Sequence, residues 1–219
     1  MEGFETYFPV WDKLTNAERA LLTESVTFRS VPAGTVLHNG DADCVGMFLI
    51  RSGQLRAYVL SETGREVTLY RLLERDMCLF SGSCMLASIQ FQITVSAEKD
   101  TGLWVIPVAT YQKLMETSIP MANYTNELMA AHLSEVMWLV DQILFRSMDS
   151  RLASFLLSES GIEESEQLCI THEQIAGHLG TAREVVTRML RYFQSEGMVR
   201  LSRGDVTLTD RKKLSALAG

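Results

Sequence analysis

The spacing of apolar residues first indicates a region rich in strands. Between Val26 and Pro107, short runs of β-branched and apolar residues are separated by clusters of Gly, Asp, Asn, Ser and Pro. This pattern is typical of short strands joined by tight turns, and many such strands favour a barrel or a double-sheet roll. Before them, Thr15 and Glu18 have the spacing of a capping box, which predicts a short amphipathic helix. The predicted strands are VTFRSV, TVLH, VGMFLI, QLRAYVLS, REVTLYRLL, ITVSA and GLWVI.

A long helical pattern follows, from about Tyr111 or Pro120 to Arg146. A helix that covers one core needs only one apolar stripe, but here apolar residues extend almost all round the helix. This breadth predicts two partners: the strand region on one side and something else on the other. A second copy of the same helix is the simplest choice for the other partner, because most oligomers are two-fold dimers. Burial inside a monomer is the alternative. The stripe predicted to form the dimer interface is Met129, Leu133, Val136, Val140 and Ile143.

The segment 171–193 predicts two short helices joined by a tight turn. Thr171 and Gln174 have the spacing of a capping box for the first helix, and Gly180 can adopt the left-handed conformation that such a turn requires. Thr181 is predicted to cap the second helix, with Glu184 at the third position of a second capping box.

The predicted second helix has two different faces. Its inward face is Val186, Met189, Leu190 and Phe193, at helical spacing. Its outward face is Arg183, Glu184, Thr187 and Arg188, which project together as a helix in a DNA major groove requires. An ordinary helical hairpin with a solvated charged face is the alternative, and Glu184 has a rival role in the predicted cap.

The C-terminal part predicts a wing after this helix pair. Residues 197–209 have the pattern of two short strands around an Arg203-Gly204-Asp205 turn. Arg200 and Arg203 are therefore candidates for contacts with DNA phosphates. The polar, acidic segment Ser158–Gln167 is predicted to be a loop.

The net charge of −7 at first disfavours a nucleic-acid-binding protein, but the charges are unevenly distributed along the chain. Residues 1–147 carry 11 basic and 17 acidic residues, whereas residues 183–219 carry 8 basic and 4 acidic residues. The positive charge is concentrated where the predicted reading helix lies, which favours one orientation on DNA.

The remaining composition is that of an ordinary soluble chain of 219 residues, with 47% hydrophobic residues. No apolar run approaching a membrane span and no signal peptide is apparent, which predicts a cytoplasmic protein without a membrane partner. Cys44, Cys78, Cys84 and Cys169 have no C-x-x-C spacing. They predict buried or reduced thiols rather than a zinc site or a disulfide framework.

The helix pair, the hinge-like Phe145–Asp149, the turns of the strand region and the terminal KLSALAG together resemble the cyclic-AMP receptor/fumarate-nitrate-reductase (CRP/FNR) family of bacterial transcription regulators. The resemblance implies an α+β fold: an N-terminal β-roll (a double-stranded β-helix like cyclic-nucleotide-binding domains), a long dimerisation helix and a C-terminal winged helix-turn-helix. It places a sensory domain at 1–147 and a DNA-binding domain at 148–219.

The same resemblance implies a homodimer that binds an inverted-repeat operator in double-stranded DNA, with RNA polymerase as a further partner. The DNA-contacting residues that it implies, together with those predicted from the pattern, are Arg183, Glu184, Thr187, Arg188, Thr171, Thr181, Arg200 and Arg203.

The predicted effector site departs from the family's cyclic-nucleotide pattern. Phe80-Ser81 stands where the family has Gly-Glu for the ribose, and Phe91-Gln92 stands where it has Arg-Ser for the phosphate. No cysteine cluster near the N-terminus suggests an iron–sulfur cluster, and His38 alone does not indicate haem. No cofactor or metal is therefore expected, and an uncharged small effector is favoured. The expected lining is Phe80, Ser81, Phe91 and Gln92, with Met129 and Leu133 from the helix.

Three alternatives stay open at this point. The protein could respond to a cyclic nucleotide through an atypical pocket, or its roll could be filled by its own side chains. A metal-dependent enzyme of the cupin type would need clustered histidine or carboxylate ligands. Because His132, His172 and His178 lie outside the strand region, no enzyme activity is expected.

Overall fold

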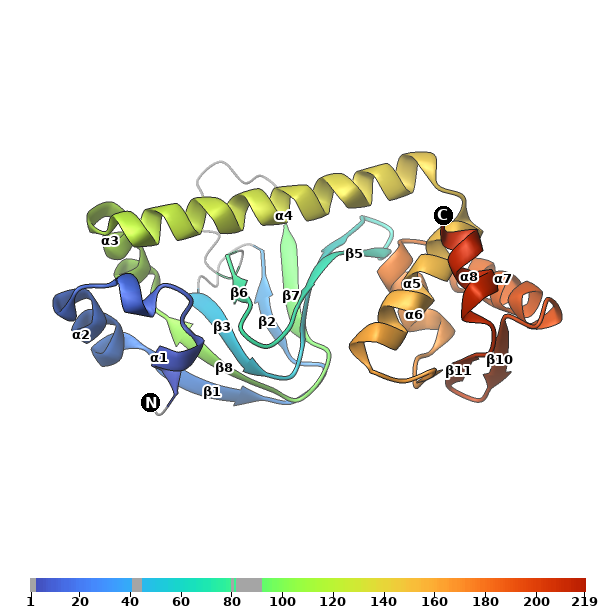
Figure 1. Ribbon diagram of the computed structural model, residues 1–219, viewed down its shortest axis with the longest axis horizontal. Helices are drawn as coiled ribbons and strands as arrows, with labels where there is room; N and C mark the ends of the chain where they lie inside the picture. Colours follow the sequence, from blue (N-terminus) through green and yellow to red (C-terminus); the bar gives the residue numbers. More distant parts are fainter. Residues whose placement is uncertain (1–2, 41–44, 80, 82–91) are drawn as a thin grey trace. The chain divides into compact units, whose positions relative to one another are not determined.

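The computed structural model describes residues 3–40, 45–79, 81 and 92–219. These residues form two compact units (Figure 1). One unit contains the described residues within 1–60 and 69–137, and the other contains residues 61–68 and 138–219. The predicted domain boundary between residues 147 and 148 falls between two helices of the second unit, and it stays a prediction.

The strands between Thr27 and Ile106 form two antiparallel sheets, in the order β1-β8-β3-β6 and β2-β7-β4-β5. Each of the predicted runs contains an observed strand, so the expected roll is confirmed. The two-residue strand β6, which is too short to carry a sequence pattern, was not predicted. The strands are β1 Thr27–Val31, β2 Val36–Asn39, β3 Met47–Ser52, β4 Leu55–Leu60, β5 Glu66–Leu72, β6 Met77–Cys78, β7 Ile93–Ala97 and β8 Thr101–Ile106.

Alternation along the strands decides which residues enter the core. In β4, Leu55 and Ala57 are buried while Arg56 and Tyr58 point to the other face, as the two-residue period of a strand requires. Buried side chains of both sheets meet in one cluster that includes Phe48, Leu72 and Val95. A second cluster, around Trp104, joins the first sheet to the N-terminal helices and to the helices after β8.

The N-terminal segment and the end of the roll are helical. Helix α1 (Phe4–Tyr7) and a 3-10 turn η1 (Trp11–Lys13) precede α2 (Asn16–Ser25). The predicted Thr15–Glu18 capping box is present at the start of α2. After β8, α3 (Val108–Thr117) and α4 (Ile119–Phe145) are separated at Ser118, so the predicted long helix begins at the later of its two expected starts.

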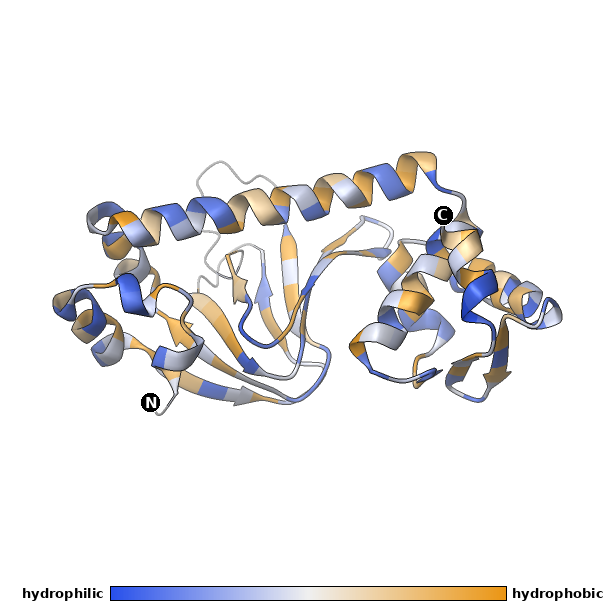
Figure 2. Ribbon diagram, viewed as in Figure 1, coloured by the Kyte–Doolittle hydropathy of each residue, from blue (hydrophilic) through white to orange (hydrophobic). Residues whose placement is uncertain are grey.

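Helix α4 has a buried and an exposed apolar side. Met121, Tyr124 and Leu128 pack into the cluster around Trp104, whereas most of the predicted interface stripe is open. Figure 2 shows apolar residues along the whole helix. The exposed fractions are 43% for Met129, 63% for Leu133, 39% for Val140 and 47% for Ile143, and Val136 is half-buried.

Among the described helices, α4 is long and apolar enough to cross a membrane, by length and composition alone. The prediction that no segment approaches such a span therefore does not hold for α4. The acidic residues Glu127, Glu135 and Asp141 interrupt its apolar runs in the sequence, and the helix is nevertheless apolar on average. One such helix is weak evidence for a membrane span, because the core helix of a soluble protein passes the same test.

The second unit contains a three-stranded sheet and four short or medium helices from residue 148 onward. Here the predicted loop at Ser158–Gln167 is wrong for its first half, because α5 continues to Ile162. Glu159 and Ser160 are buried there, so the polar composition misled the prediction. The elements are α5 Met148–Ile162, β9 Gln167–Leu168, α6 His172–Leu179, α7 Arg183–Ser195, β10 Val199–Ser202, β11 Asp205–Leu208 and α8 Arg211–Ala218.

Candidate nucleic-acid interface

Helix α6 begins and ends as its sequence predicts. The hydroxyl of Thr171 accepts from the backbone N–H of Gln174 at 3.2 Å, and the backbone N–H of Thr171 donates to Gln174 Oε1 at 2.8 Å. This reciprocal pair satisfies two N–H groups that a helix start would otherwise leave without a partner. At the other end, Gly180 adopts the left-handed conformation, with φ of 65°.

The start of α7 differs from the prediction. The N-cap is Ala182, whose side chain makes no capping bond, and the helix begins at Arg183. Thr181 lies one residue before this N-cap, and its backbone N–H donates to the carbonyl of Ala176 in the turn that ends α6. Glu184 is therefore not a capping-box partner, and its side chain is exposed in the first turn of the helix.

The two faces of α7 are separated as predicted. Val186, Leu190 and Phe193 are completely buried in a core shared with α5, α6, α8 and the wing strands, and Met189 packs against it. On the outer face, a shallow hollow of about 540 Å³ is lined by the four predicted reading residues and by Arg191. Arg191 was not predicted, although it follows Arg188 and Thr187 at helical spacing of three and four residues. The lining residues are Arg183, Glu184, Thr187, Arg188 and Arg191.

A half-buried arginine joins the helix pair to α5. The Arg151 guanidinium donates to the backbone carbonyl of Leu179 at 2.6 Å, near the end of α6. A cation at a helix C-terminus is favourable, because the carbonyls there carry partial negative charge. Burial lowers the pKa of Arg151 below its usual value, yet an arginine keeps its charge at neutral pH.

The wing has the geometry that the sequence predicts. Strands β10 and β11 pair antiparallel, from Val199 opposite Leu208 to Ser202 opposite Asp205, and Arg203 and Gly204 form the loop between them. The side chains of Arg200 and Arg203 are exposed. They are thus open to solvent and to phosphate, as the prediction requires.

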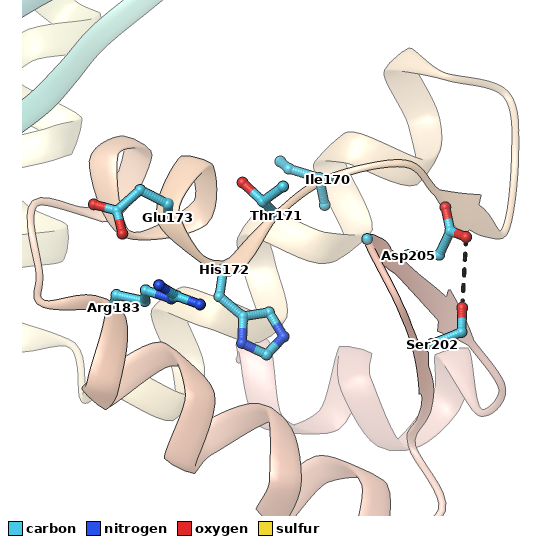
Figure 3. Close-up of a pocket in the computed structure, with 8 residues that line it drawn as sticks. Ile170, Thr171, His172, Glu173, Arg183, Ser202 and Asp205 are labelled. Carbon is cyan, nitrogen blue, oxygen red and sulfur yellow. Dashed lines mark hydrogen bonds between the residues drawn. The ribbon is translucent and has the colours of Figure 1, made fainter.

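A second hollow, of about 420 Å³, lies between the start of α6 and the wing loop. Figure 3 shows His172 and Arg183 turned toward each other in it, with Asp205 and Ser202 on the wing side. The Nδ1 atom of His172 lies 2.9 Å from Thr187 Oγ1 on α7. Burial, followed by the positive charges of Arg183 and Arg191, lowers the pKa of His172 below its usual value. No sequence pattern singled out His172, because its contact with α7 arises only from packing.

The predicted effector residues are only partly described. Phe80 and Phe91 lie outside the described residues. Ser81 is buried, and its hydroxyl donates to the Cys78 carbonyl at 2.8 Å and accepts from the Phe48 N–H at 3.2 Å. This hydroxyl is therefore engaged in holding the backbone. Gln92 is exposed, as are Met129 and Leu133 on α4.

Within the described ranges, no group of three or more His, Cys, Asp or Glu side chains is placed to hold a metal ion. Cys78 is buried and Cys169 is exposed, and neither forms a disulfide, while Cys44 and Cys84 lie outside the described residues. A hydrogen bond to Asp205 raises the pKa of Cys169, which keeps that thiol protonated and less nucleophilic.

Comparisons with known proteins agree with this architecture. A Crp-like helix-turn-helix domain matches residues 150–217, and a cyclic nucleotide-binding domain matches residues 28–118. A solved structure assigned to the crp/fnr family of transcriptional regulators, from Eubacterium rectale, is 55% identical with a TM-score of 0.94; the match covers 97% of this chain and 99% of that one.

Two curated relatives extend the likeness. The cyclic AMP receptor protein of Thermus thermophilus is 28% identical over 213 residues, which are 96% of each chain. The fumarate and nitrate reduction regulatory protein of Escherichia coli is 24% identical over 201 residues, covering 87% of this chain and 78% of that protein.

Proposed function

Because the chain belongs to the CRP/FNR family of DNA-binding transcription regulators, we propose that it acts as a homodimer whose two α7 helices read an inverted-repeat operator. The observation that carries the proposal is the outer face of α7. It combines three arginines, one carboxylate and one hydroxyl on a helix whose opposite face is fully buried. Members of this family are regulators of transcription, not enzymes.

We infer separate roles for the residues of this face. Arg183 and Arg188 donate to guanine edges, Glu184 accepts from cytosine N4, and Thr187 lies beside them. Thr171 at the start of α6, Thr181 in the turn, and Arg200 and Arg203 on the wing contact phosphates. The absence of a capping role for Glu184 supports its part in base reading.

The Arg188→Ala variant tests this function. A bidentate arginine–guanine contact discriminates against a wrong base by about 1–3 kcal/mol, so the variant should lose preference at one operator position while keeping salt-sensitive nonspecific binding. Selection from randomised double-stranded DNA measures that preference. Arg29→Ala, which removes an exposed arginine from β1, is the control and should keep it. Unchanged selectivity of Arg188→Ala would contradict the assignment.

The open stripe of α4 supports the homodimer. Large apolar side chains exposed on successive turns of one helix are unfavourable in water, and a second copy of α4 would bury them. Two parallel α4 helices would present the two reading helices to successive major grooves, roughly 34 Å apart. The same family membership supports a cytoplasmic location and RNA polymerase as a partner.

We further propose that the roll binds a small uncharged effector. The predicted lining of Phe80, Ser81, Phe91 and Gln92 contains no cation to hold a cyclic phosphate. The alternative is a cyclic-nucleotide-responsive regulator with an atypical pocket, which is favoured by the match of the cyclic nucleotide-binding domain to residues 28–118.

A further inference from the structure

His172 and Thr187 join the two helices of the candidate interface through one polar contact. His172 is the first residue of α6, and its Nδ1 lies 2.9 Å from Thr187 Oγ1 on α7. Thr187 also lines the hollow on the outer face of α7. One hydroxyl therefore faces both the imidazole ring and the surface proposed to read bases.

The protonation of the ring decides whether the Thr187 hydroxyl can donate its hydrogen to a DNA base. A threonine hydroxyl has one hydrogen to donate and two lone pairs to accept. In the neutral tautomer that carries its hydrogen on Nε2, the Nδ1 atom of His172 can only accept, so the hydrogen of Thr187 is directed at it. In the imidazolium ion both ring nitrogens are donors, so Thr187 accepts from the ring. Its own hydrogen is then released for an acceptor on a base edge, such as purine N7 or thymine O4.

Charged groups lie around this ring on the elements that are packed near it. Arg183 and Arg191 face it from α7, Glu173 follows it on α6, and Asp205 lies across the hollow on β11. In the free protein the pKa of His172 is lowered, first by burial and then by the two arginines. DNA phosphates beside Arg183 would offset that positive charge and favour the imidazolium ion.

We propose that His172 is a positioning residue that sets the hydrogen-bond direction of Thr187, and with it the base preferred at one operator position, according to its protonation. This inference rests on the proposed reading role of the α7 face. The complex holds more protons at His172 than the free protein does. Operator affinity therefore rises as pH falls through the interval between the two pKa values of that ring, and the base preference changes over the same interval.

The first experiment is selection from randomised double-stranded DNA at about pH 6 and about pH 8, which bracket the ordinary imidazole pKa of about 6.5. For the unaltered protein, preference at one position of each half-site should change by roughly three- to ten-fold between the two pH values, the effect of one hydrogen bond. His172→Gln should bind DNA with a preference that no longer depends on pH. Thr187→Val should show no preference at that position at either pH.

The matched control is His178→Gln, which removes a histidine of the same helix whose Nδ1 contacts Thr68 instead. It should keep the pH-dependent preference. If His172→Gln also keeps it, or if His178→Gln alone loses it, the proposal is overturned. If Thr187→Val and Arg188→Ala both leave every preference unchanged, the proposed reading function itself fails, which is a different result.

A second measurement needs no variant. Nitrogen NMR of the imidazole in the unaltered protein reports the pKa of His172 with and without operator DNA. A higher pKa in the complex, together with proton uptake in calorimetry performed in two buffers, supports the proposal. An unchanged pKa overturns it, even if His172→Gln fails to fold.

Discussion

Two threonines with the same local pattern differ in what they do. Thr171 and Thr181 are each followed by an acidic or amide residue three positions on, but only Thr171 accepts a capping bond. The backbone N–H of Thr181 is already bonded to the Ala176 carbonyl. Helix α7 begins one residue later than the pattern predicts, with Ala182 as its N-cap, so the Thr181 hydroxyl has no capping role there.

This difference predicts unequal costs of substitution. Thr171→Ala should lower the free energy of unfolding of the unit by about 1 kcal/mol, because it removes an N-cap hydrogen bond. Thr181→Ala is the matched control and should cost only a few tenths of that amount, roughly the value of an exposed substitution. Urea denaturation followed by circular dichroism measures both. Equal losses for the two variants would show that Thr181 also stabilises the helix start.

At the scale of elements, α4 exposes large apolar side chains that a partner helix would bury. Only 11% of an apolar stretch of 18 residues in this helix is buried within the described part of the chain. Trp138, Met137 and Leu144 are more than half exposed, beside the predicted stripe. Burial of such side chains contributes about 1.5–3 kcal/mol each, which is enough over several turns to hold two helices together.

Leu133→Glu should therefore yield a monomer. In a two-fold dimer the substitution places two like charges in an apolar interface, where an unpaired charge is costly. Ser134→Glu adds the same charge at the next, exposed position and should remain a dimer. Analytical ultracentrifugation gives the oligomeric state of both, and operator binding should weaken only for the monomer. If Leu133→Glu sediments as a dimer, the predicted face is the wrong one.

At the scale of the whole molecule, the excess of basic residues lies in the part of the chain that carries the candidate nucleic-acid interface. The net charge is −7, yet residues 183–219 carry 8 basic and 4 acidic residues. The roll does contain the half-buried arginines Arg56 and Arg71, but their Nε atoms lie 4.0 and 3.4 Å from the Glu98 carboxylate. That carboxylate competes with any phosphate for them, so these cations do not make the roll a strong anion site.

Cyclic nucleotides are accordingly expected not to bind in the micromolar range. Isothermal titration calorimetry with cyclic AMP and cyclic GMP, beside a panel of neutral aromatic metabolites, measures this directly. The cyclic AMP receptor protein of Thermus thermophilus, titrated in parallel, is the control for the assay. Micromolar binding of either nucleotide to this protein would favour the alternative of an atypical pocket. Binding of a neutral metabolite would support the proposed class of effector.

The sequence alone determined the elements whose signals are local. Strand alternation, the Thr171 box, the left-handed Gly180 and the buried stripe of α7 depend on residues a few positions apart, so the roll, the helix-turn-helix and the wing were predictable. Tertiary structure decided what depends on packing between distant segments. Helix α5 continues through a polar segment in which Glu159 and Ser160 are buried. The backbone N–H of Thr181 donates to Ala176 of the preceding helix. Tertiary structure also brought His172 against Thr187, because only the packing of α6 on α7 brings residues fifteen positions apart within hydrogen-bond distance.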